Sequence, residues 1–171
     1  GNTPLYWNRV ASQIATQRSL PLLQEARLFA RLNVAMADAA IACWDSKYRY
    51  VFWRPITAIR DSSNASPDPT WTPWLDSFPA GTPPHPEYPS GHSTVSGAAA
   101  FTLAAVFGDD TAFTVTSEVR TGTRSFTSFS AAVAEIADAR VFGGIHFRTS
   151  CVRGNMLGRA VAQYVAAHSM R

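Results

Sequence analysis

Charged residues are scarce in this chain of 171 amino acids, where Asp, Glu, Lys and Arg together make up 16%. The net charge is only +3, and the Lys and Arg residues are scattered rather than clustered. A basic patch is the electrostatic footprint of nucleic-acid binding, so we expect no nucleic-acid partner. The low charged fraction also favours some apolar surface that meets a missing N-terminal half of a longer chain or a second copy in a homo-oligomer.

Cysteine is nearly absent. Cys43 and Cys151 lie far apart in the sequence and form no CxxC or metal-type cluster, so two buried free thiols are favoured over one disulfide. The N-terminal residues 1–9 contain no basic region followed by an apolar run, so no signal peptide is visible. A processed secreted or periplasmic product stays open, and the sequence assigns no compartment.

A hydrophobic run long enough to cross a bilayer is also missing. The longest uncharged apolar segment, Ser93 to Gly108, has 16 residues and includes several Ser and Thr. It is too short and too polar to span a membrane, so the sequence predicts a soluble protein with no transmembrane segment. Apolar residues make up 46% of the chain, enough for one domain with a core of its own.

Helical periodicity dominates the chain. Residues 20–50 predict one long helix that begins after a capping Ser19. Its expected core face carries apolar residues at steps of three and four: Leu23, Ala26, Ala30, Val34, Ala37, Ile41, Trp44 and Tyr48.

Further helices are predicted over residues 6–17, 90–107 and 130–142, and from Thr149 or Ser150 to about residue 168. The last helix is expected to point six residues inward: Val152, Met156, Leu157, Val161, Tyr164 and Val165. Residues 111–124 stay ambiguous between a loop, a short strand and a helix. The predicted architecture is all-α, a single domain over residues 1–171 with a bundle of four to six helices.

A proline-rich loop is expected between two of these helices. Residues 61–86 contain seven prolines and many small polar residues. Loops of this length within one domain are usually functional or disordered. Because Trp71, Trp74 and Phe78 are large and apolar, we expect them to pack this loop down as the wall of a pocket at the active-site end of the bundle.

Candidate site residues occur in three separate segments. Lys47 and Arg54 are seven residues apart, a spacing that returns to nearly the same helix face, and Pro55 disfavours continuation of the helix. Pro89-Ser90-Gly91-His92 stands at a predicted helix start, where free N–H groups and the helix dipole favour an anion. Ser90 is expected to cap this helix.

The third segment holds Arg140 and His146, six residues apart. On one unbroken helix these side chains would point to different faces, but Gly143-Gly144 predicts a break that lets His146 turn back toward Arg140. Together the three segments offer two Arg, one Lys, two His and a helix N-terminus. That inventory suits a tetrahedral oxyanion, which Arg grips with a planar fork and Lys attracts as a point charge.

The three motifs resemble those of the vanadium-dependent haloperoxidases and the type 2 phosphatidic acid phosphatases. These motifs are Lys47-x6-Arg54-Pro55, Pro89-Ser90-Gly91-His92 and Arg140-x5-His146. The segment AMADAAIACWDSKYRYVFWRPITAIR is similar to the soluble bacterial and fungal haloperoxidases, and the likeness covers most of the chain. Members of this type are usually longer, so the resemblance is to their catalytic C-terminal half.

The resemblance implies a role for each matching residue. It assigns Lys47, Arg54, Ser90, Gly91 and Arg140 to the oxyanion's oxygens. It makes His146 the ligand of vanadium, or the nucleophile in a phosphatase. It makes His92 the acid or base, and it gives Lys47 a further catalytic role, the polarisation of bound peroxide.

The resemblance also implies vanadate as cofactor, with phosphate able to take the same place. The expected partners are hydrogen peroxide, a halide and an organic substrate, or else a phosphate ester.

Two departures from the family pattern bear on the site. Ala139 and Ser150 stand where the family commonly has Ser and Asp, so a carboxylate that would orient His146 is expected to be missing. His85, with Trp44, is the candidate for the halide side, because His85 stands at a position the family uses to tune halide chemistry. His85 is equally interpreted as a loop residue without a role.

The resemblance implies two functions, in this order: a vanadium haloperoxidase, then a soluble acid phosphatase that works through a phosphohistidine. A third interpretation, kept open by the low charged fraction, is a non-catalytic phosphate-binding fragment or half of an assembly.

Overall fold

Helices account for most of the fold that the computed structural model describes over residues 2–77, 81–117 and 121–169. Within those residues the chain forms six α-helices, one short 3-10 helix and one two-stranded hairpin, so the predicted helical bundle is confirmed. In chain order they are α1 (Thr3–Gln17), α2 (Leu22–Tyr50), α3 (Pro55–Arg60), η1 (Trp74–Ser77), α4 (Gly91–Phe107), β1 (Phe113–Thr116), β2 (Thr123–Phe126), α5 (Phe129–Phe142) and α6 (Arg148–His168).

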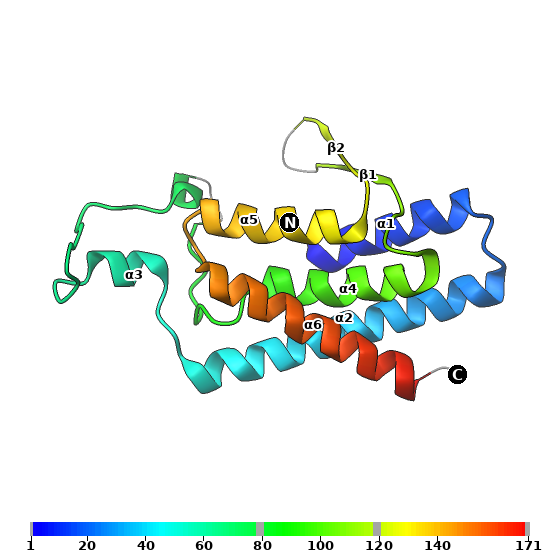
Figure 1. Ribbon diagram of the computed structural model, residues 1–171, viewed down its shortest axis with the longest axis horizontal. Helices are drawn as coiled ribbons and strands as arrows, with labels where there is room; N and C mark the ends of the chain where they lie inside the picture. The colour runs from blue at the N-terminus through cyan, green and yellow to red at the C-terminus, as the bar shows by residue number, and fades with distance from the viewer. Residues whose placement is uncertain (1, 78–80, 118–120, 170–171) are drawn as a thin grey trace.

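Helix α4 runs through the middle of the bundle, with α5 on one side and α6 and α2 on the other (Figure 1). It carries no charged residue, and ten of its 17 residues are buried, as expected for a helix enclosed by others. Ser90 caps it by accepting a hydrogen bond from the Ser93 N–H, and Gly108 ends it with a φ of 85°. Both predicted ends are confirmed, so the Ser90–His92 segment lies at one end of the central helix.

The contact between α4 and α6 depends on glycine. A Cβ atom on Gly158 would lie 1.9 Å from the Thr94 carbonyl oxygen, and one on Gly154 would lie 2.7 Å from the Ser90 carbonyl oxygen. The two backbones therefore touch directly. The inward face predicted for α6 was largely wrong, because Met156 and Tyr164 are 55% and 65% exposed. Among the six residues predicted to point inward, only Val165 is buried.

The core face of α2 is also not the predicted one. All eight residues of the expected stripe are exposed, while the buried face carries Leu28, Leu32, Ala35, Met36, Ala39, Cys43 and Lys47. Both faces of α2 have apolar residues at helical spacing, so periodicity alone could not choose between them. The predicted Ser19 cap was wrong as well: Ser19 has a φ of 49°, and Pro21 occupies the N-cap position.

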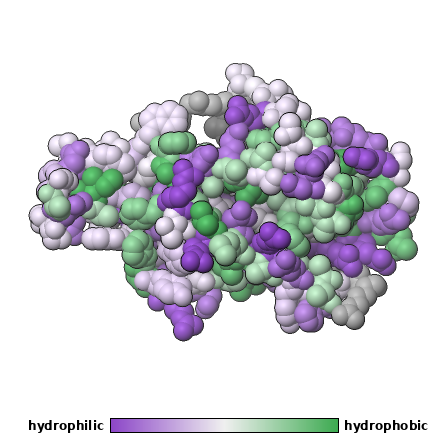
Figure 2. All heavy atoms as spheres, viewed as in Figure 1, coloured by the Kyte–Doolittle hydropathy of each residue, from purple (hydrophilic) through white to green (hydrophobic). Residues whose placement is uncertain are grey.

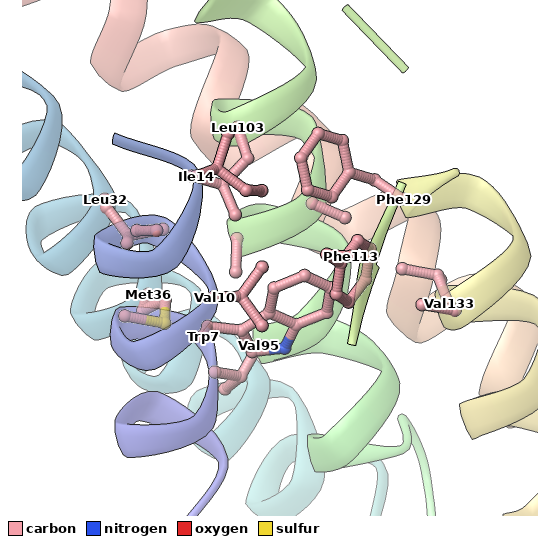
Figure 3. Close-up of a cluster of buried hydrophobic side chains, with 14 of the residues drawn as sticks. Trp7, Val10, Ile14, Leu32, Met36, Val95, Leu103, Phe113, Phe129 and Val133 are labelled. Carbon is pink, nitrogen blue, oxygen red and sulfur yellow. The ribbon is translucent and has the colours of Figure 1, made fainter. Parts of the chain in front are cut away.

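The main core lies between α1, α2, α4, α5 and the hairpin (Figure 3). The hairpin is the segment that the sequence left ambiguous, and its strands pair Phe113 with Phe126. The Phe113 ring stacks on Phe129 at 5.3 Å between centroids and lies 6.3 Å from Trp7. The hairpin therefore closes one side of the bundle with aromatic side chains.

The long loop after α3 lies at one end of the molecule (Figure 1). Trp71 packs this loop down against the turn at Gly144, since a Cβ on Gly144 would lie 3.1 Å from its ring, but it lines none of the cavities described below. Trp74 does not pack the loop down, because it is 64% exposed. Phe78, the third expected wall residue, lies outside the described residues.

Hydrophilic and hydrophobic residues alternate in small patches on the face seen in Figure 2, and neither kind covers it. Over the described parts of the chain, no helix combines the length and apolar character needed to cross a membrane.

We predict that Gly158→Ala destabilises the fold although alanine favours helices. Helix propensity alone would add up to about 1 kcal/mol of stability. The new Cβ instead meets the Thr94 backbone, which cannot move as a side-chain end would, so α4 and α6 must separate, at a cost of about 1–3 kcal/mol. Urea unfolding followed by circular dichroism measures the change, with Ala160→Gly at an exposed position of α6 as the control for propensity. An increase in stability in Gly158→Ala would contradict the close contact.

Candidate active site

A cavity of about 260 Å³ lies beside the N-terminus of α4, and we call it the histidine cavity. Side chains from α2, the proline-rich loop, α4, α5 and the turn before α6 line it together with Thr3 and Pro4 of α1. Six of the predicted site residues are among them: Trp44, His85, Gly91, His92, Arg140 and His146. The structure thus brings the three predicted segments to one place, with Lys47, Arg54 and Ser90 beside the cavity.

His146 reaches this cavity because the chain breaks after α5. Gly144 has a φ of 76°, a left-handed conformation that suits glycine, and a Cβ there would lie 3.0 Å from the Pro73 backbone. The predicted break is therefore confirmed. It places His146 in the same cavity as Arg140, although six residues separate the two.

Glu87 is the functional residue that sequence reasoning missed. Its side chain is fully buried, and its Oε1 atom lies 2.7 Å from His146 Nδ1. Oε1 also accepts the Phe147 N–H at 3.0 Å, and Oε2 accepts the Ser150 hydroxyl. The expected absence of a carboxylate beside His146 was therefore wrong: Glu87 supplies it from another segment, and Ser150 holds Glu87 in place.

A signal for Glu87 was present in the sequence. It is the only acidic residue between Asp76 and Asp109, a stretch that otherwise has no charge, and it stands three residues before Ser90. A lone acid in such a stretch is buried only when it is paired, so it pointed to a partner that the sequence alone did not locate.

The ionisation of this pair follows from burial and hydrogen bonding. Burial opposes ionisation of Glu87, but the hydrogen bonds from His146, Ser150 and Phe147 outweigh it and lower the pKa of Glu87. Burial lowers the pKa of His146 to about 4, against the opposing effect of Glu87. At neutral pH His146 is therefore an uncharged imidazole that donates its Nδ1–H to a carboxylate.

The other nitrogen of His146 faces Arg54. Arg54 Nη1 lies 3.2 Å from His146 Nε2 and donates to the Ile145 carbonyl at 2.7 Å. Because Nδ1 carries the proton, Nε2 keeps a lone pair, which accepts the hydrogen bond from Arg54 in this structure and is the atom that a metal centre would bind. Arg54 also donates from Nε and Nη2 to the His85 carbonyl, so the guanidinium is fixed in position.

His85 lies in the cavity wall rather than on the outer surface of its loop. Its Nδ1 atom is 3.2 Å from Arg54 Nη2, and its ring centroid is 5.4 Å from that of Trp44. Burial, followed by the charges of Lys47 and Arg54, lowers the pKa of His85 below its ordinary value. His85 is therefore mainly uncharged at neutral pH.

Lys47 is fully buried, although a lone Lys near the buried face of a helix usually keeps its ammonium group in solvent. Its Nζ donates to the carbonyl oxygens of Pro86 and Glu87 at 2.8 and 3.0 Å. Burial lowers the pKa of Lys47 to about 8. The ammonium thus fixes the loop that carries Glu87, and two of its three N–H donors are used there.

The α4 end of the cavity is formed by Ser90, Gly91 and His92. Ser90 Oγ accepts from both the N–H and the hydroxyl of Ser93, so its side chain serves the helix cap in this structure. A Cβ on Gly91 would lie 3.1 Å from the Trp44 ring, so glycine allows Trp44 to approach. Burial, with the charge of Arg140, lowers the pKa of His92 to about 3, which leaves it able to accept a proton.

Arg140 shows what the cavity is suited to hold. Its Nε atom is buried and has no hydrogen-bond partner among the described residues. A buried charged donor without a partner is costly, so its partner is expected from outside the chain. The nearby cations are Lys47, Arg54 and Arg140, and Glu87, the one buried carboxylate in the described parts of the chain, is engaged by His146. This charge balance fits an anion with several oxygens, and no group of three or more His, Cys, Asp or Glu in the described residues could enclose a metal cation.

The fold and the site together are a helical bundle with a cavity that holds a buried arginine donor without a partner and a carboxylate-bound histidine. The chain belongs to the family described as the VCPO second helical-bundle domain, whose model matches residues 27–171. It is 35% identical to the vanadium chloroperoxidase of Curvularia inaequalis over 57% of this chain and 19% of that protein.

Two solved structures have the same fold. A bacterial vanadium-dependent iodoperoxidase is similar at a TM-score of 0.87 and 38% identity, over 98% of this chain and 39% of that one. A holo-type bacterial vanadium-dependent chloroperoxidase is similar at a TM-score of 0.76 and 18% identity, over 96% of this chain and 40% of that one. At 18% identity the second likeness concerns the fold alone. This chain therefore spans well under half the length of these relatives.

We predict that the buried histidines make the fold acid-sensitive. The pKa of His92 falls from 6.5 to about 3 and that of His146 to about 4, so below about pH 6.5 the unfolded chain binds protons that the folded chain does not. The free energy of unfolding should therefore fall with pH from about 6.5 toward 4, by up to about 1.4 kcal/mol per pH unit for each histidine.

Urea titrations at several pH values test this. Every variant has the same carboxylates, so their titration contributes equally and differences in slope report on the histidines. His92→Gln should lose one histidine's share of the slope between pH 6.5 and 4. His168→Gln, at an exposed position at the end of α6, should keep the wild-type slope. Equal slopes in wild type and His92→Gln would contradict the burial of a neutral His92.

Proposed function

We propose that this chain carries the vanadate site of a vanadium-dependent haloperoxidase, an oxidoreductase that uses hydrogen peroxide to oxidise halide. The observation that carries the proposal is the pairing of two groups in one cavity. Arg140 Nε is buried without a partner, and His146 has its Nδ1 bound to Glu87, so that its Nε2 lone pair faces the arginines and accepts only from Arg54 Nη1. An oxyanion with a coordinating centre satisfies both at once.

The residues have separate tasks in this proposal. His146 Nε2 would be the ligand, and Glu87 would hold its ring in the productive tautomer and raise its basicity. Arg54 and Arg140 would donate to oxygens of the anion, so Arg54 Nη1, now 3.2 Å from Nε2, would turn to an oxygen instead. Vanadate, when bound, would supply a Lewis-acid centre that activates hydrogen peroxide toward halide.

Proton transfer is assigned to His92. His92 lines the histidine cavity, and no Asp or Glu of the described residues lines it as well. Burial keeps His92 uncharged at neutral pH. A neutral imidazole can accept a proton from a bound peroxide or water and return it to a leaving oxygen. Bound anion would raise the low pKa of His92 by attraction, which brings it closer to the working pH.

His85 and Trp44 are proposed for the halide side. Their rings lie 5.4 Å apart in the wall of the histidine cavity, next to the fixed Arg54 guanidinium. Arg54 and Arg140 supply the positive field that a halide needs, and the two rings supply an apolar surface that leaves it partly desolvated. The halide that is preferred follows from this wall rather than from the oxyanion ligands.

A phosphatase on the same cavity is the second candidate, and Glu87 is the observation that favours it. A phosphohistidine mechanism needs a nucleophilic histidine with an orienting carboxylate, and the Glu87–His146 pair has that geometry. The relatives named above are a chloroperoxidase and an iodoperoxidase, which gives the haloperoxidase the first place. A non-catalytic domain that binds phosphate, or half of an assembly, is the third, since the chain spans 39% of one such relative.

The test loads apo-protein with orthovanadate and compares two reactions, the peroxide-dependent bromination of a diketone and the hydrolysis of an aryl phosphate. We expect bromination that depends on vanadate and is inhibited by phosphate, with hydrolysis at least tenfold slower. His146→Ala should lose vanadate on gel filtration, because it removes the ligand, whereas His92→Ala should retain vanadate and lose turnover. Hydrolysis without bromination would support the phosphatase, and equal vanadate loss in both variants would refute the assigned roles.

A further inference from the structure

A second and larger cavity, of about 550 Å³, lies between α1, the β-hairpin, α4 and α5. We propose that it binds a phenol, meaning an electron-rich aromatic molecule of one or two rings with a hydroxyl group, beside the histidine cavity. The volume is within the range of about 300–1,000 Å³ usual for small-molecule sites. We call it the aromatic cavity, and the proposal rests on the function proposed above.

The walls of the aromatic cavity are rings held in fixed positions. Trp7 donates its indole N–H to Ser96 Oγ at 3.0 Å, which orients the ring from α1. Phe113 of β1 lies next to Trp7 and 5.4 Å from Phe126 of β2, as the neighbouring Trp7 and Phe113 rings in Figure 3 illustrate. Planar rings on two sides favour a planar aromatic guest, which can stack or meet them edge to face.

The aromatic cavity shares one end with the histidine cavity. Three residues line both: Thr3, His92 and Arg140. Elsewhere the lining is mostly aromatic or aliphatic, with the hydroxyls of Ser96 and Ser117 as exceptions, so the imidazole and the guanidinium both lie at this shared end. A phenol would therefore place its ring among the aromatic side chains and its hydroxyl toward Arg140 and His92. Arg140 has five N–H donors, enough to serve an anion on one side and a phenol oxygen on the other.

This placement also gives the reaction its geometry. The oxidised halide would leave the histidine cavity as hypohalous acid, HOX, next to the bound ring. The ring then gives an electron pair to X, its C–H bond is replaced by a C–X bond, and the displaced proton leaves with the hydroxide of HOX as water. Halogen is reduced, the ring is oxidised, and no further reagent is needed. A ring held at the shared end would react before HOX diffuses away.

Binding is tested without peroxide or vanadate, so its outcome is separate from catalysis. Titration calorimetry of apo-protein with 2-naphthol should give one saturable site, and naphthalene should bind at least fivefold more weakly because it lacks the hydroxyl. Val115→Trp should weaken 2-naphthol at least tenfold by filling the cavity from β1. Thr114→Trp is the matched control, since the neighbouring residue on a strand faces the opposite side and Thr114 is exposed; it should bind within twofold of wild type.

Circular dichroism and urea unfolding show whether each variant is folded, with the wild-type spectrum expected for both. Should Val115→Trp lose that spectrum, Ile136→Trp on α5 takes its place as the filling variant. The absence of naphthol binding, or equal binding in the filling variant and wild type, would overturn the proposal. So would a dimer in sedimentation that Val115→Trp dissociates, because a second copy would then occupy the cavity. If 2-naphthol binds as expected but no bromination occurs, the proposed function fails while the site stands.

Discussion

A buried carboxylate organises the functional end of this molecule. Glu87 has no access to water, and such a charge is tolerated only when its lone pairs are satisfied. Its oxygens take hydrogen bonds from His146, Phe147 and Ser150, while its backbone carbonyl accepts from Lys47. One residue thus ties the proline-rich loop to the end of α2, to the turn after α5 and to the first turn of α6. The same contacts fix the ring of His146, so the constraint that stabilises this end also orients the histidine that we propose as the ligand.

The second constraint is the direct backbone contact of α4 with α6. Gly154 and Gly158 bring α6 against the first turns of α4. This contact places Ser150 beside Glu87 and lets the Ser90 N–H donate a hydrogen bond to the Ser150 carbonyl. Side chains of ordinary size at these glycines would separate the helices and move Ser150 away from the carboxylate. Stability and site geometry therefore depend on the same small residues. Because α4 is enclosed by other helices, it also carries no charged residue.

The sequence predicted elements and motifs better than faces. The ends of α4, the break at Gly143-Gly144 and the meeting of Arg140 with His146 were predictable because capping, glycine and proline act locally. The buried face of α2 was not, since both its faces have apolar residues at helical spacing. The contact of α6 was missed because most of its buried residues are small, Gly154 and Gly158 among them, and give little hydropathy to detect. Glu87 was missed because its partners stand about 60 residues away in the chain, and only the fold brings them together.

The central claim is that an ionised Glu87 keeps His146 neutral, with its proton on Nδ1 and Nε2 free for the oxyanion centre. Nitrogen-15 NMR of the His146 ring in apo-protein tests it most directly, followed from about pH 8 down to about pH 5, above the lowered pKa of about 4. The account predicts a protonated Nδ1 and an unprotonated Nε2 throughout, with a change at Nε2 when orthovanadate is added and at Nδ1 in Glu87→Gln. A proton on Nε2, or an imidazolium that persists at neutral pH, would contradict it.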